Sequence, residues 1–377
     1  MSNLTEFPAY QRLHGSLAGA HESRLNWSTG RDMLDLYGGH CVNSLGAGNG
    51  ELAQALAKQW ETLSFTTNLI DHPGHAAFLE AWQALMPEGD WQVFASNSGA
   101  EANENILKWA LQGTGRGVVV CFEGAFHGRT AAADAVSHGM GAFPSAPFDV
   151  RRLPWGSTEG IDSDVAAVIL EPIQSLAGVV DPPAGFLEAL RERCDASGAW
   201  LLFDEVQTGN GRLGQPWASQ FFGVTPDAFS TAKGVAGGIP MGLSFLRSNL
   251  SKQVPSHVSG ATFGGNPMSL AGSVVIAQHL ARPGFLAHVR ELSEGFRKLV
   301  GVGPVVGVRG AGLLLGLELH PTVTATQARD VLFDAGILVG TSRDPFILRL
   351  SPPLNLPLSA VDELAAALQT IEVGAVS

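Results

Sequence analysis

One lysine in this sequence has surroundings that suit covalent chemistry. Lys233 lies in the segment STAKG (residues 230–234), with Gly237 and Gly238 shortly after it. Small and hydroxyl-bearing neighbours leave space around the amine, and a desolvated amine is a good nucleophile toward a carbonyl carbon. The other four lysines fall in helical patterns or in a polar stretch, which is typical of solvated surface charges: Lys58, Lys108, Lys252 and Lys298.

A second candidate is the acid at the end of an apolar run. Asp204 and Glu205 directly follow WLLF (residues 200–203). A carboxylate at the carboxyl edge of a buried strand can hold a metal ion or a protonated ring nitrogen. Acids also end strands without any functional role, so this position alone indicates no particular chemistry.

Two further segments offer groups that bind anions. In SNSGAEAN (residues 96–103), Ser98, Gly99 and Ala100 open a predicted helix, whose free N–H groups attract phosphate. A capping box between Ser98 and Glu101 would explain the same pattern without a ligand. The loop FEGAFHGRT (residues 122–130) combines an aromatic ring, an imidazole and a guanidinium, and arginine often pairs with carboxylates.

The elements around these residues predict an α/β fold. Short apolar runs at 118–122, 165–170 and 200–203 alternate with helical patterns at 101–111 and 185–196. This alternation is typical of a mainly parallel sheet, in which ligands bind beyond the carboxyl ends of the strands. We expect a large domain over residues 46–271 and a smaller α+β domain made by 1–45 with 272–377. The first 30 residues are expected to be irregular.

Composition excludes several classes of protein. The chain has 377 residues, 45% of them hydrophobic, and a formal net charge of −12, which disfavours a nucleic-acid or anionic-membrane partner. No apolar run reaches the length of a membrane span, and the N-terminus lacks the pattern of a secretory signal. Three scattered cysteines indicate neither a disulfide framework nor a metal site. We therefore expect a cytoplasmic enzyme.

Taken together, the candidate groups suit one cofactor. Pyridoxal 5′-phosphate carries a phosphate, a flat ring, a basic ring nitrogen and an aldehyde, and an acid beside the nitrogen makes the ring an electron sink. From about residue 34 to residue 368 the chain resembles the class III (ornithine-type) aminotransferases, which are pyridoxal-phosphate enzymes of fold type I. The resemblance is carried by motifs in the family's order: SNSGAEAN, FHGRT, EPIQ, LLFDEVQTGNGRLG, AKGVAGG and TFGGNP.

The resemblance implies a role for each matching residue. Lys233 is the catalytic residue, which bonds to the cofactor aldehyde and moves the substrate proton, and Asp204 pairs with the ring nitrogen. The other implied cofactor contacts are Ser98, Gly99 and Ala100 on the phosphate, Phe126 and Val206 on the ring faces, Gln207 at the ring 3-hydroxyl, and Thr262 on the phosphate of a neighbouring subunit. Arg129 and Arg349 bind substrate carboxylates, and Glu171 is a structural acid near the cofactor loop.

The resemblance implies a homodimer that transfers an ω-amino group to 2-oxoglutarate. The amino donor that the resemblance favours is N2-acetylornithine. One departure bears on this expectation, because Leu176 replaces a glutamate that rests against the C-terminal arginine in the family. We therefore expect Arg349 to lack its resting partner. Residues 46–50 (GAGNG) and Ala261 also depart from the family pattern.

Other functions stay open at this point. The amine could instead be ornithine, 4-aminobutyrate or a lysine-pathway amine, the enzyme could be an aminomutase, or the protein could bind the cofactor without catalysis. The segment GNGRLG (residues 209–214) matches G-x-G-x-x-G, but Pro216 follows where a helix should begin, so we do not expect a dinucleotide site.

Overall fold

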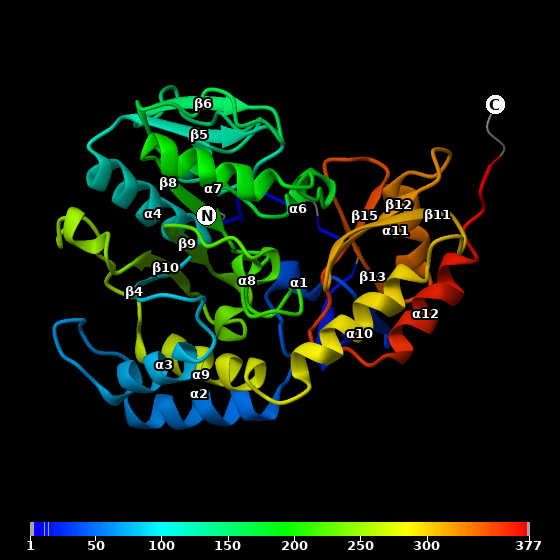
Figure 1. Ribbon diagram of the computed structural model, residues 1–377. Helices are drawn as coiled ribbons and strands as arrows, with labels where there is room; N and C mark the ends of the chain where they lie inside the picture. Colours follow the sequence, from blue (N-terminus) through cyan, green and yellow to red (C-terminus); the bar gives the residue numbers. More distant parts are fainter. Residues whose placement is uncertain (1–3, 11, 14, 375–377) are drawn as a thin grey trace.

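A seven-stranded sheet forms the centre of the molecule (Figure 1). The computed structural model describes residues 4–10, 12–13 and 15–374. The strand order is β4 (Trp91–Ser96), β10 (Gly242–Arg247), β9 (Ala228–Thr231), β8 (Trp200–Asp204), β7 (Val165–Leu170), β5 (Val118–Phe122) and β6 (Asp149–Leu153). Only β10 runs antiparallel to its neighbours. The expected mainly parallel α/β sheet is therefore confirmed.

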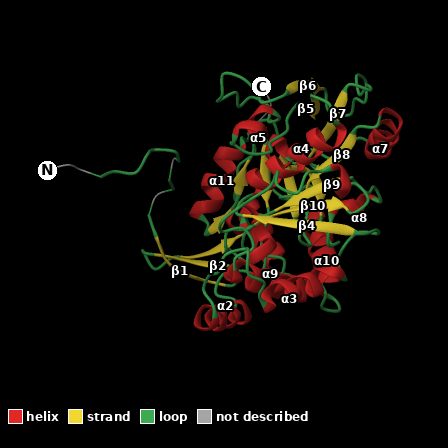
Figure 2. Cartoon of the chain, turned by 90° about the vertical axis from the view of Figure 1, so that its left-hand side faces the viewer, coloured by secondary structure: helices red, strands yellow, loops and turns green. Residues whose placement is uncertain are grey.

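Helices cover both faces of this sheet. Figure 2 shows the sheet between α4 (Gly99–Thr114) on one side and α3 (Pro73–Gln83) with α9 (Pro267–Leu280) on the other. Helix α4 begins where predicted, because the Ser98 hydroxyl accepts the Glu101 N–H and the Glu101 carboxylate accepts the Asn97 N–H. The remaining helical elements of this part are α2 (Gly50–Thr62), α5 (Ala131–Ala135), α6 (Ser175–Gly178), α7 (Phe186–Ser197), α8 (Ala218–Phe222), η1 (Lys233–Ala236) and η2 (Ser251–Gln253).

The C-terminal part adds a smaller α+β layer. Its four-stranded sheet has the order β11 (Val305–Ala311), β12 (Leu314–Leu319), β15 (Ile347–Leu350) and β14 (Gly340–Thr341). The helices α10 (Phe285–Arg297), α11 (Ala325–Asp334) and α12 (Ser359–Leu368) lie beside it in Figure 1.

The N-terminal segment differs from the expectation of irregular structure. Strands β1 (Leu17–His21) and β2 (Arg24–Trp27) pair with each other, and β2 pairs with β3 (Asp32–Asp35), which runs parallel to β13 (Ile337–Leu338). That expectation was wrong because the sheet is completed by residues about 300 positions away, and such pairing leaves no local pattern. The two-domain division stays a prediction; the β3–β13 pairing supports joining the N-terminal segment to the C-terminal part, and α9 crosses residue 271.

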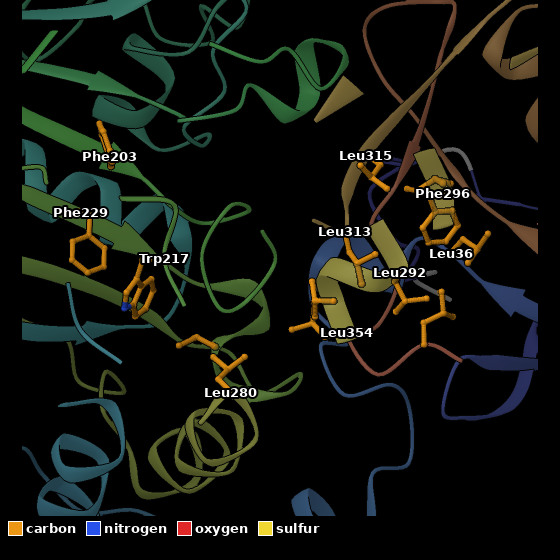
Figure 3. Packing of buried hydrophobic residues seen from close by; sticks show 14 of the residues in the cluster. Leu36, Phe203, Trp217, Phe229, Leu280, Leu292, Phe296, Leu313, Leu315 and Leu354 are labelled. Carbon is orange, nitrogen blue, oxygen red and sulfur yellow. The ribbon is translucent and has the colours of Figure 1, made fainter. Parts of the chain in front are cut away.

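Aromatic side chains are a large part of the buried core beside the central sheet, and Figure 3 shows Trp217 next to Phe229. Trp217 is fully buried, with its ring 5.0 Å from that of Phe229, 5.6 Å from that of Phe245 and 5.2 Å from that of Trp82. It therefore joins α3, the loop before α8, and strands β9 and β10.

Within the described residues, no helix has the length and apolar character needed to cross a membrane.

We expect Trp217→Ala to lower the free energy of unfolding by roughly 3–5 kcal/mol, because a large buried ring would be replaced by a cavity. The matched control is Phe221→Ala on neighbouring α8, whose side chain is 43% exposed and should change stability by less than about 1 kcal/mol. Chemical denaturation with circular dichroism measures both. Equal losses in the two variants would contradict this account of the core.

Candidate active site

A cavity of about 500 Å³ lies where strands β4, β5, β8 and β9 end. These strands point the same way, so the residues that follow them meet at one edge of the sheet. The cavity is lined by most of the residues that the sequence singles out: Ser98, Gly99, Ala100, Phe126, Arg129, Asp204, Val206, Gln207 and Lys233. Two others, Thr262 and Arg349, do not line it within this chain.

Lys233 occupies the turn after β9 in an unusual backbone conformation. Its φ is +47°, in the left-handed region that non-glycine residues rarely adopt outside functional sites. Gly234 follows because a Cβ there would lie 2.1 Å from the Ser44 Oγ. Burial lowers the pKa of the Lys233 amine, which favours the neutral and nucleophilic form.

Asp204 is a buried carboxylate that is held by three hydrogen-bond donors. Its Oδ2 accepts hydrogen bonds from Asn103 Nδ2 and His127 Nδ1, each at 2.8 Å, and its Oδ1 accepts the Val206 N–H at 3.0 Å. Among the described residues, no lysine or arginine forms an ion pair with Asp204. The carboxylate is thus oriented toward the cavity and is available to a cationic group of a ligand.

This supporting pair was not predicted from the sequence. The imidazole of His127 was not connected to Asp204, and Asn103 had no expected role. Asn103 ends the SNSGAEAN motif, and its own oxygen accepts the Ser230 hydroxyl at 2.5 Å. Both residues belong to motifs that were recognised, but their shared acceptor lies more than 70 residues away along the chain.

The neighbouring carboxylate, Glu205, points away from the cavity. Its two oxygens accept the N–H groups of Ala218 and Ser219 at 2.5 and 3.0 Å, which caps α8. Burial raises its pKa to about 7. Successive side chains along an extended chain point to opposite faces, so Asp204 faces the cavity whereas Glu205 caps α8.

The start of α4 forms a cradle suited to an anion. The N–H groups of Gly99 and Ala100 have no acceptor among the described residues, since Ser98 caps Glu101 instead. A Cβ on Gly99 would lie 2.9 Å from Val206 Cγ2, so only glycine lets the turn approach that side chain closely.

Phe126 is held at the opposite wall by a buried acid. Its N–H donates to Glu171 Oε1 at 2.9 Å, while Glu171 Oε2 accepts the Ser175 N–H at 3.2 Å. Burial raises the pKa of Glu171 to about 7. The guanidinium of Arg129 lies 5.1 Å from the Phe126 ring centre and is exposed to solvent at the mouth of the cavity.

Arg349 is buried on β15 and has two neutral partners. Its Nη1 donates to Ser175 Oγ at 3.2 Å, and its Nη2 donates to the hydroxyl of Tyr37, whose ring lies 5.3 Å from the guanidinium. Among the described residues no carboxylate forms an ion pair with Arg349, in line with the expectation drawn from Leu176. The guanidinium does have resting partners, but these are two neutral hydroxyl groups.

Thr262 lies on the exposed loop before α9, outside the cavity of its own chain. Its assignment to the phosphate of a neighbouring subunit stays a prediction.

The segment at 209–214 forms turns, and the next helix, α8, begins only at Ala218, so the glycines do not open a helix as a dinucleotide site requires.

The site fits pyridoxal phosphate on several independent grounds. Gly99 and Ala100 offer N–H donors to a phosphate, Asp204 is a buried acid with no lysine or arginine partner among the described residues, and Lys233 is an amine with a lowered pKa in the same cavity. In the part of the chain that the structure describes, no group of three histidine, cysteine or acidic side chains is arranged to hold a metal ion.

We expect Asp204→Asn to raise the dissociation constant of pyridoxal phosphate by about 10- to 100-fold, the cost of losing one charged hydrogen-bond partner. Glu205→Gln is the matched control, because that side chain caps α8 and should leave the affinity unchanged. Absorbance titration of the cofactor-free protein measures both. An unchanged affinity in Asp204→Asn would contradict this geometry.

Comparisons with known proteins agree with the site. The family model described as Aminotransferase class-III matches residues 11–371. The chain is 38% identical over 357 residues to the acetylornithine aminotransferase of Mycobacterium tuberculosis, covering 91% of this chain and 88% of that protein. It is also 38% identical to the same enzyme of Streptomyces coelicolor over 361 residues, covering 93% and 89%.

Solved structures extend the likeness to the fold. The N-acetylornithine aminotransferase of Stenotrophomonas maltophilia superposes with a TM-score of 0.82 and 29% identity, covering 96% of each chain. The ornithine aminotransferase of Toxoplasma gondii has a TM-score of 0.87 at 24% identity, covering 96% of this chain and 91% of that one, which shows a shared fold. The chain therefore belongs to the class III aminotransferase family and is a pyridoxal-phosphate-dependent transaminase.

Proposed function

We propose that this transaminase moves the terminal amino group of N2-acetylornithine to 2-oxoglutarate, giving a semialdehyde and glutamate, as arginine biosynthesis requires. The observation that carries the proposal is the identity of 38% over more than 90% of the chain with the two acetylornithine aminotransferases named above. The alternatives left open by the sequence, which are other ω-amines, an aminomutase and a non-catalytic protein, have no comparable support.

Two guanidinium groups fit the substrates of this reaction. Arg129 is at the mouth of the cavity, and Arg349 is buried beyond Ser175 yet close enough to lower the pKa of Lys233 electrostatically. 2-Oxoglutarate carries two carboxylates, and arginine pairs with carboxylates through two parallel hydrogen bonds. Acetylornithine has one carboxylate and a blocked α-amine, so only its terminal amine can react.

The side chains around Lys233 define the proposed roles. Bound pyridoxal phosphate supplies an aldehyde that accepts amino groups and a ring that withdraws electrons. Lys233, with its lowered pKa, holds the aldehyde and then accepts and returns a proton at its Nζ. Asp204 keeps the ring nitrogen protonated, and the α4 N-terminus from Ser98 to Ala100 binds the phosphate. Phe126 and Val206 confine the ring, while Gln207 contacts its 3-oxygen.

A homodimer is part of the proposal. An exposed apolar surface lies around Phe65 and Phe263, whose rings are 5.4 Å apart and whose side chains are 42% and 62% exposed. Asn68 Nδ2 donates to the carbonyl of Ala261 at 2.8 Å and holds this loop beside Thr262. A second copy covering this surface would bring Thr262 toward the phosphate of its neighbour.

A cytoplasmic location is also proposed, and the free, buried state of Cys41, Cys121 and Cys194 supports a reducing compartment.

The amine preference is tested by mixing the cofactor-loaded enzyme with one amine at a time, without an acceptor. N2-acetylornithine should remove the absorbance band of the lysine-linked cofactor. The second-order rate constant of this loss should be at least tenfold higher than with ornithine or 4-aminobutyrate, a difference of about 1.4 kcal/mol. Subsequent addition of 2-oxoglutarate should restore the band. Preference for another amine would overturn the substrate assignment, and no response to any amine would overturn transamination.

A further inference from the structure

A buried hydroxyl joins the arginine proposed for substrate carboxylates to the glutamine proposed for the cofactor ring. Ser175 is fully buried at the first position of α6. Arg349 Nη1 donates to Ser175 Oγ at 3.2 Å, and Ser175 Oγ donates to Gln207 Oε1 at 3.0 Å. Three side chains from separate segments thus form one continuous line of hydrogen bonds.

The direction of these hydrogen bonds follows from the groups themselves. A guanidinium has only donors, so Ser175 Oγ must accept from Arg349. The single hydroxyl proton is then free for Gln207 Oε1, which also accepts from Cys41 Sγ at 3.5 Å. Because the Gln207 oxygen is occupied on both sides, its NH₂ group is left to face the cavity that Gln207 lines.

Arg349 lies at the other end of this line with its charge uncompensated. Its partners, Ser175 and Tyr37, are neutral, and no carboxylate of the described residues forms an ion pair with it. Its Nε is buried without a hydrogen-bond partner in the described chain. A buried cation in this state strongly favours an incoming carboxylate, and an anion that draws the Nη1 proton weakens donation to Ser175.

We propose that Ser175 is a positioning residue that links Arg349 to Gln207, so that the guanidinium strengthens the donation of the Gln207 amide to the cofactor ring oxygen. This inference rests on the proposed roles of Arg349 and Gln207. Hydrogen bonds arranged donor to acceptor in one direction polarise one another. A carboxylate bound at Arg349 would therefore change the hydrogen bond between Gln207 and the cofactor ring oxygen through Ser175, in addition to its electrostatic effect through space.

The linkage has a spectroscopic consequence in the absence of any reaction. A donor to the ring oxygen stabilises its anionic form, which favours loss of the proton from the nitrogen that joins the cofactor to Lys233. Removing the Ser175 hydroxyl should therefore raise the pH midpoint of the cofactor's absorbance change. The charged and titratable groups that interact electrostatically with Lys233 are Cys41, Asp204, Arg349, Glu171 and His40, and all remain in the variants unless named below.

A double-mutant cycle on the cofactor-loaded protein separates the linkage from electrostatics through space. Ser175→Ala should raise the midpoint by roughly 0.5 pH unit, about a threefold change in the protonation equilibrium. In the Arg349→Gln background the same substitution should change it by less than half as much, because the hydroxyl is no longer polarised. Ser175→Thr, which keeps a hydroxyl, should resemble the parent protein.

Cys41→Ala is the matched control for this cycle. It removes the other donor to Gln207 Oε1, but Cys41 has no hydrogen bond to Arg349, so its effect should add to that of Arg349→Gln. Additive effects of Ser175→Ala and Arg349→Gln would overturn the linkage. If the alanine variant does not fold, as judged by near-UV circular dichroism, Ser175→Cys enters the same cycle with the same expected non-additivity.

Binding of glutarate, a dicarboxylate without a keto group, tests the underlying assignment separately. Arg349→Gln should weaken glutarate binding to the loaded protein by roughly tenfold or more, the loss of a charged hydrogen bond. Unchanged glutarate binding would refute the proposed substrate role of Arg349. An additive cycle together with weakened glutarate binding would refute only the role of Ser175.

Discussion

The active site depends on one buried acid that forms no ion pair with a lysine or arginine of the described residues. Asp204 ends β8 in the interior, where an ionised carboxylate is costly unless several donors satisfy it. Asn103, His127 and the Val206 N–H supply those donors, and each comes from a different segment. Among the described residues no lysine or arginine pairs with this acid, and we propose that the protonated ring nitrogen of pyridoxal phosphate is the cationic group that Asp204 holds beside Lys233.

The fold places these groups by the simple geometry of a parallel sheet. Strands β4, β5, β8 and β9 deliver the phosphate cradle, the aromatic wall, the acid and the lysine to the same edge. Alternation along β8 then assigns Asp204 to the cavity and Glu205 to the cap of α8. Lys233 has a positive φ next to Gly234, where the Ser44 Oγ donates to the Gly234 carbonyl at 3.3 Å and would lie 2.1 Å from an added Cβ.

The predictable parts of the molecule were those with a local signal. The α4 cap, the apolar strands and the glycines around Lys233 are visible within a few residues, and the motif order indicated the cofactor. The partners of Asp204 and Arg349 were not predictable in this way, because His127 lies 77 residues from Asp204, and Tyr37 lies 312 residues from Arg349. Strands β1 and β2 were missed for the same reason, since their sheet is completed by β13.

The most direct test of the central claim is chemical fixation of the bound cofactor. Borohydride reduction of the loaded protein, followed by proteolysis and mass spectrometry, should add the reduced pyridoxyl phosphate to the peptide that contains Lys233. The matched sample of Lys233→Arg should carry no label, although the phosphate cradle and Asp204 remain. A label on any of the other four lysines, or no label on the parent protein, would contradict the account.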